Sequence, residues 1–221
     1  MASVLQVATI KDQGGNANAI EIANSSANVT INNLAGGAIG SNVTFPTGFV
    51  GIKSYTVENL NKWYGTATSS SGTELFTGSG GFTSSAITPV SSSSKFFVTL
   101  TVNATTDEHD FDKSAGIIIK RKIGSGSYAE SDLVGASSGV RYRTSFTVKG
   151  LAFNDGHNGM PYTISGIDAP SHSGSTVTYQ VQYMIQDSSA ALHCNGTPAN
   201  GNSTGPHQAR HKCIMTIIEV A

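Results

Sequence analysis

Charged side chains are scarce in this 221-residue sequence, which has 13 Lys and Arg, 14 Asp and Glu, and a formal net charge of -1. They make up 12% of the chain, about half of the share in an ordinary soluble domain. A nucleic-acid-binding surface needs a clustered excess of basic side chains, and the densest cluster here is only Lys120-Arg121-Lys122. We therefore expect no nucleic-acid partner, and a surface made polar by Ser, Thr, Asn and Gly.

Long apolar runs are also missing. No stretch approaches the roughly 20 apolar residues that a membrane-spanning helix needs. Residues 1–12 lack the basic start, apolar middle and small-residue cleavage site of a secretory signal peptide. We therefore expect a protein made in the cytoplasm that is not inserted into a membrane and does not enter a secretion pathway on its own.

Recognisable catalytic patterns are scarce as well. No pair of carboxylates can be placed with the geometry that glycoside hydrolysis requires. The run Asn154-Asp155-Gly156-His157 suggests acid–base chemistry, but Asn, Asp and Gly also build turns because they tolerate positive φ. We expect neither enzymatic activity nor a bound cofactor or metal.

What the sequence does contain is alternation of apolar and polar residues with a period of two. Apolar residues alternate in this way over residues 95–103, 140–148 and 175–187, which predicts half-buried strands. Residues 116–120 and 213–220 are apolar on both faces, so we expect inner strands covered by a second sheet or by another subunit. Strong helix formers are few, and no window shows sustained helical periodicity.

Turn-forming residues separate these runs. Gly, Ser, Asn and Asp cluster at residues 78–81, 124–127, 154–156 and 171–174. The spacing of strands and turns predicts an all-β protein, an antiparallel sandwich or jelly-roll-like head.

The N-terminal part of the chain differs from the rest. Residues 1–44 contain short strands of small residues, and no aromatic residue precedes Phe45. Such light strands bury too little apolar surface to offset the entropy of ordering them alone. We therefore predict an attachment or stalk segment over residues 1–44, stabilised by copies of itself or by a larger body, and a β head over residues 45–221.

Four segments carry a resemblance to a known family. They are Phe45 to Val50, Ala86 to Lys95 with the alternating strand that follows, Ile117 to Arg121, and Met215 to Ala221 at the chain end. In this order they resemble the fibre and tail-fibre-like virion proteins of marine tailed bacteriophages, including those that infect cyanobacteria. The resemblance covers roughly residues 45–221, and the light N-terminal strands are similar to the stems of such proteins.

The resemblance implies a structural protein of the virion surface. It implies a homotrimeric tail fibre or head fibre that docks on other virion structural proteins through residues 1–44. The head at residues 45–221 would then recognise a host-surface glycan or protein. The alternative is a capsid decoration, cement or adaptor protein without receptor binding.

The segment 190–212 is longer and richer in His and Cys than the resemblance implies. Cys194 and Cys213 bracket a loop rich in Gly, Asn, Pro and His. A disulfide between them would stabilise the fold by roughly 3 kcal/mol, but two free thiols are an open alternative. Metal binding is a third, since His193, His207 and His211 join the cysteines as zinc-type ligands, although their spacing matches no closed zinc motif.

Host contacts are expected at loop tips and at exposed aromatic residues. Trp63 and Tyr64 could stack on a sugar ring, although a lone Trp is more often buried in a core or between subunits. The loops at 104–112 and 190–212 are the predicted tips. The candidate contact residues are Trp63, Tyr64, His193, His207 and His211.

Overall fold

The computed structural model describes seven ranges of the chain: residues 53–66, 72–106, 114–136, 142–149, 159–185, 190–196 and 211–220. All regular elements in these ranges are strands, so the prediction of an all-β head is confirmed. The predicted stalk, residues 1–44, and its boundary with the head lie outside the described residues. In the described part of the chain, no helix is long and apolar enough to cross a membrane.

The first sheet is built around the long strand β4 (Lys95–Thr106). Strand β8 (Met160–Asp168) pairs with one edge of β4, and β11 (Cys213–Val220) pairs with the other. The short strand β10 (Leu192–Cys194) pairs with β4 beyond the end of β11. Next come β1 (Ser54–Asn59), paired with β11, and β2 (Trp63–Gly65), paired with β10. All these pairings are antiparallel.

The second sheet has β5 (Ala115–Ile123) and β9 (Val177–Ile185) at its centre, paired antiparallel along their whole length. The short strands β6 (Ala129–Glu130) and β7 (Phe146–Val148) pair with the other edge of β5. Strand β3 (Thr73–Glu74) pairs with β9. The chain after β3 continues along β9, where Ser84 N–H donates to Tyr179 O at 2.8 Å and Ile87 N–H donates to Val177 O at 2.8 Å.

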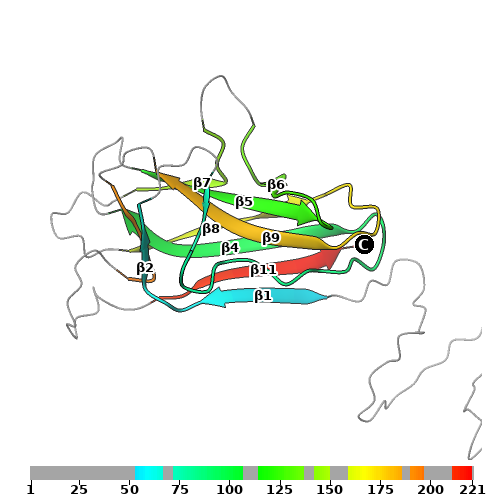
Figure 1. Ribbon diagram of the computed structural model, residues 1–221, viewed down its shortest axis with the longest axis horizontal. Coiled ribbons are helices and arrows are strands. Elements are labelled where there is room, and N and C mark those ends of the chain that lie inside the picture. The colour runs from blue at the N-terminus through cyan, green and yellow to red at the C-terminus, as the bar shows by residue number, and fades with distance from the viewer. Residues whose placement is uncertain are drawn as a thin grey trace, which may run out of the picture. The chain divides into compact units, whose positions relative to one another are not determined.

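The two sheets pack as a sandwich around one apolar core (Figure 1). Alternate residues of each central strand point into this core, as the period of two requires. Among those that are fully buried are Phe96, Val98 and Leu100 of β4, Ile117 and Ile119 of β5, and Tyr179 and Val181 of β9. The antiparallel sandwich predicted from strand and turn spacing is the fold observed.

Three strands differ in burial or extent from the expectations. Strand β9 is buried on both faces, whereas alternation predicted a half-buried strand. Strand β11 is buried on one face and half-buried on the other, not covered twice within the described residues. Of the predicted strand 140–148, the structure describes residues 142–148, among which Phe146–Val148 form a strand and Tyr142 is 56% exposed.

Candidate functional site

In two neighbouring positions of the first sheet, the place of one long strand is taken by two shorter strands with a break between them. The two breaks lie at the same level of the sheet. Cys194 of β10 lies opposite Ala104, and Ile214 of β11 lies opposite Thr101, so β10 and β11 occupy successive stretches of one edge of β4. The chain between them is therefore an insertion into one strand position. On the next strand position, residues 60–62 separate β1 from β2.

Asn195 holds the two interruptions together. Its side chain is buried, and its Nδ2 donates to Asn59 O at 2.7 Å and to Asn61 O at 3.2 Å. Its backbone N–H donates to Asn103 O at 3.0 Å, which attaches it to β4 as well. Its φ of 56° lies in the left-handed region, which Asn tolerates better than most residues. Asn195 therefore fixes the base of the insertion against three segments.

An open pocket of about 680 Å³ lies at this level of the sheet. It lies on the outer face, because the β4 and β11 residues that line it are half-buried and alternate with buried core residues. Its lining residues are Leu60, Thr101, Asn103, His211, Lys212 and Ile214. An apolar floor bordered by hydroxyl, amide, imidazole and ammonium groups can bind a small polar ligand with apolar faces.

Polar contacts fix the walls of this pocket. Asn103 Nδ2 donates to Lys212 O at 2.7 Å, which joins the loop base to β4. Lys212 Nζ donates to Glu58 Oε1 at 3.0 Å in an exposed ion pair. The Thr101 hydroxyl lies 2.9 Å from the Thr163 hydroxyl on β8. The pocket is therefore shaped by four strands of one sheet.

A stacked pair of rings, Tyr64 and His193, lies on the same face. Tyr64 of β2 is 67% exposed, and its ring stacks on the ring of His193 with centroids 6.1 Å apart and an interplanar angle of 25°. His193 lies opposite Thr105 of β4, which is two residues from the pocket residue Asn103 and so on the same face. The structure thus brings together three of the predicted contact residues, Tyr64, His193 and His211, on the outer face of the first sheet.

Trp63 does not belong to this surface. Its side chain is only 8% exposed, and its ring packs at 5.0 Å from Tyr183 and 5.6 Å from Phe76. Its Nε1 donates to Thr77 O at 3.1 Å. Because neighbouring strand residues point to opposite faces, exposing Tyr64 places Trp63 in the core. Its prediction as an exposed contact is wrong, and the alternative of core burial holds.

The remaining predicted site residues lie in or beside the insertion. His207 is outside the described residues, as is most of the predicted loop tip. Cys194 and Cys213 are buried free thiols in this structure. Burial raises the pKa of the Cys194 thiol well above its ordinary value, and the neighbouring thiol of Cys213 raises it further. Among the described residues, no three His, Cys, Asp or Glu side chains gather to hold a metal ion.

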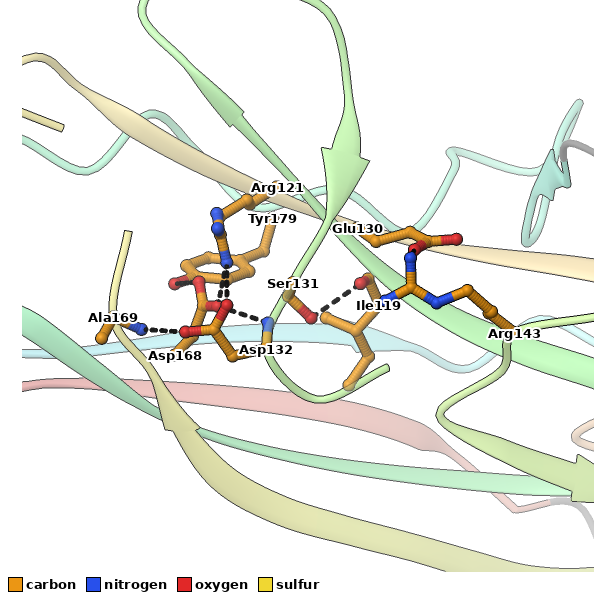
Figure 2. Close-up of polar contacts among 9 residues, drawn as sticks. All are labelled: Ile119, Arg121, Glu130, Ser131, Asp132, Arg143, Asp168, Ala169 and Tyr179. Atoms are coloured by element: carbon orange, nitrogen blue, oxygen red, sulfur yellow. Dashed lines mark hydrogen bonds and ion pairs between the residues drawn. The ribbon is translucent and has the colours of Figure 1, made fainter. Parts of the chain in front are cut away.

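A second cluster of ionisable groups lies between the sheets (Figure 2). Asp168 at the end of β8 is fully buried and forms an ion pair with Arg121 of β5. Its carboxylate also accepts from Tyr179 Oη at 2.6 Å and from Asp132 N at 2.7 Å. Burial and the Asp168 charge raise the pKa of Tyr179, so its hydroxyl stays a donor. The charge of Asp168 is paired with side chains and backbone of the protein itself. We therefore interpret this cluster as a polar crosslink between the two sheets.

Several residues of the pocket were not predicted. Leu60 and Asn103 line the pocket, and Glu58 pairs with the lining residue Lys212. These three residues carry no motif, and each becomes a site residue only through strand register. In the sequence, Asn195 is only one residue of the loop that Cys194 and Cys213 bracket. The signal that could have found it is the Asn195-Gly196 pair, since Asn and Gly both tolerate positive φ.

Comparison with known proteins provides no further assignment. No protein-family model matches the chain, and no curated protein matches it significantly.

Proposed function

We propose that this protein is a structural virion appendage of a tailed phage, a tail fibre or head fibre, that binds saccharides on the host surface. Residues 1–44 attach it to other virion proteins, and residues 45–221 form the exposed head. Three copies form the appendage. The sequence resemblance supports the virion role, and the sandwich fold is compatible with it.

The observation that carries the binding role is the outer face of the first sheet. There the pocket and the exposed ring of Tyr64 lie on the same face of the sheet. A saccharide presents hydroxyl groups at its edge and apolar C–H groups on its faces. The amide of Asn103 and the hydroxyl of Thr101 suit the edge, and an exposed aromatic ring suits the face.

Weak single sites are sufficient for this role. Three identical sites on one particle raise the effective affinity for a dense surface by orders of magnitude, because the second and third contacts form at high effective concentration. A shallow, open pocket therefore fits a multivalent appendage better than it fits a tight monovalent receptor.

The test is binding of the full-length protein to an array of neutral and acidic bacterial surface saccharides. We expect Tyr64→Ala to lower binding about tenfold, a free-energy loss of about 1.4 kcal/mol, through loss of the stacking face. Tyr142→Ala is the matched control, since Tyr142 is also an exposed tyrosine, 56% exposed, and precedes β7 of the second sheet rather than lying on the first. It should bind like the wild type.

Two results would contradict the proposal. One is that the wild-type protein binds no saccharide on the array and no host-cell surface, which would favour a decoration or adaptor protein. The other is that Tyr64→Ala and Tyr142→Ala bind equally well, which would remove the outer face of the first sheet as the binding surface.

A further inference from the structure

The two cysteines lie at the two ends of the insertion described above. Cys194 is opposite Ala104 of β4, and the register of β11 places Cys213 opposite Val102. Cys194 and Cys213 therefore lie along the same edge of β4, opposite residues that are two positions apart. Both side chains are on the buried face of the sheet. Two residues along a strand span about 6.6 Å between Cα atoms. This separation is within the range found across disulfide bonds, about 4.4–6.8 Å.

The side chains are already in contact. Cys213 Sγ donates to Asn195 Oδ1 at 3.2 Å, and the Cys213 thiol lies close enough to Cys194 to raise the pKa of the Cys194 thiol. Both are fully buried in the core cluster. A buried, protonated thiol reacts slowly. We therefore expect oxidation to require local opening of the loop base that exposes one of the two thiols.

We propose that Cys194 and Cys213 are an oxidation site, where a peroxide-class oxidant forms an intramolecular disulfide that closes the loop of residues 195–212. One thiolate attacks a peroxide oxygen, which gives a sulfenic acid and releases hydroxide that becomes water. The sulfur of the second thiol then displaces the sulfenic hydroxyl as a second water. Each sulfur gives up one electron, and the two thiol protons end in the two water molecules.

The disulfide acts on the pocket wall. His211 and Lys212 directly precede Cys213, and Cys213 pairs with Asn59, the neighbour of the pocket residue Leu60. In the reduced protein the loop base is held by Asn195 and by Asn103 through hydrogen bonds. In the oxidised protein it is held covalently as well. The inference rests on this geometry and is independent of what the pocket binds.

The experiment uses full-length protein purified with reductant, freed of it, and treated with hydrogen peroxide. Thiols are counted in denaturant before and after treatment, and non-reducing peptide mapping locates the bond. We expect two thiols to fall to none, with a peptide joining Cys194 to Cys213. The thermal midpoint should rise and return to its starting value with dithiothreitol, because the bond restricts the unfolded chain.

Cys194→Ser and Cys213→Ser are the matched controls. Each retains one thiol and a hydroxyl in place of the other, so the thermal midpoint should not rise with oxidant. The thiol count is made in denaturant, so it reads the bond even in a variant of low stability. Two thiols that persist after treatment would overturn the inference. So would bonds formed only between chains, or a bond formed at the same rate when the protein is oxidised in urea.

Discussion

Asn195 is the single residue on which the base of the insertion depends. Its side-chain amide donates to the carbonyl of Asn59 at the end of β1 and to that of Asn61 between β1 and β2, and its φ is positive. The Asn195→Gly variant can adopt the same positive φ but lacks the side-chain amide that makes these hydrogen bonds. We expect it to lower the free energy of unfolding by about 2–3 kcal/mol, the cost of leaving buried polar groups unpaired.

Asn195→Ala separates the two contributions. It loses the same hydrogen bonds as Asn195→Gly and adds the steric cost of a left-handed residue with a Cβ, about 1 kcal/mol. Urea unfolding of the three proteins at one pH measures both effects. Equal stability of the Ala and Gly variants would show that the positive φ carries no cost here.

Asp168 is the buried charge of the inter-sheet crosslink. Asp168→Asn keeps the shape of the side chain but removes the charge that faces Arg121. We expect a loss of about 3–5 kcal/mol in the free energy of unfolding, because a guanidinium is left without its buried counter-ion. Asp132→Asn is the control, since its side chain is 48% exposed and should cost less. Urea unfolding that ranks the two in reverse order would contradict this role.

Asp132 gives the same crosslink a pH dependence. The pKa of Asp132 is lowered from 3.8, first by the hydrogen bond from Ala169 N–H and then by Arg121. The folded-state pKa is therefore below that of the unfolded chain. The stabilisation is present above pH about 4 and is lost as the pH falls through the folded-state pKa.

The difference in unfolding free energy between wild type and Asp132→Asn should accordingly be larger at neutral pH than at about pH 2, because protonation of Asp132 removes its charge as the pH falls. Urea unfolding at the two pH values measures it. A difference that stays constant across this range would exclude Asp132 as a source of acid sensitivity.

At the scale of elements, alternation in the sequence predicted strands better than it predicted their burial. Strand β4 has Phe96, Val98 and Leu100 in the core, as the period of two requires. In β9 the side chains of Gln180 and Gln182 are polar yet buried. Gln180 Nε2 donates to Thr83 Oγ1 and Gln182 Nε2 donates to Gln180 Oε1, so both Nε2 groups are hydrogen-bonded inside the fold. Composition alone does not contain that information.

The segment that follows β3 is an element that no local pattern predicted. It has little regular structure but runs along β9 and places Leu75, Phe76 and Phe82 in the core. Its shape is fixed by Glu74, whose Oε1 accepts from Phe82 N–H at 3.2 Å and from the Thr83 hydroxyl at 2.6 Å. A single carboxylate thus organises the edge of the second sheet.

Glu74→Ala should loosen this segment locally. Hydrogen bonds to a charged acceptor contribute about 1.5–3 kcal/mol each, so we expect at least tenfold faster amide exchange at Ser84 and Ile87, which donate to β9. Native-state hydrogen exchange measures this directly. Glu58→Ala, which removes an acidic side chain on the first sheet, should leave these two amides unchanged. Equal exchange in the wild type and Glu74→Ala would contradict the role of Glu74.

At the scale of the whole molecule, the fold class could be predicted from the sequence, but the site could only be predicted in part. Tyr64 and His193 were named as contact residues from their residue types, yet their stacking depends on pairing between strands far apart in the sequence. The hydrogen bond from Asn195 to Asn59 joins residues 136 positions apart. No local pattern encodes such a contact, because it arises from sheet register.

The proposed trimer is the claim from which multivalent binding follows. Its most direct test is the mass of the full-length protein in solution, measured by native mass spectrometry or light scattering. The account predicts a species of three times 22.8 kDa that resists mild denaturant. A stable monomer at the same concentrations would contradict the trimeric appendage.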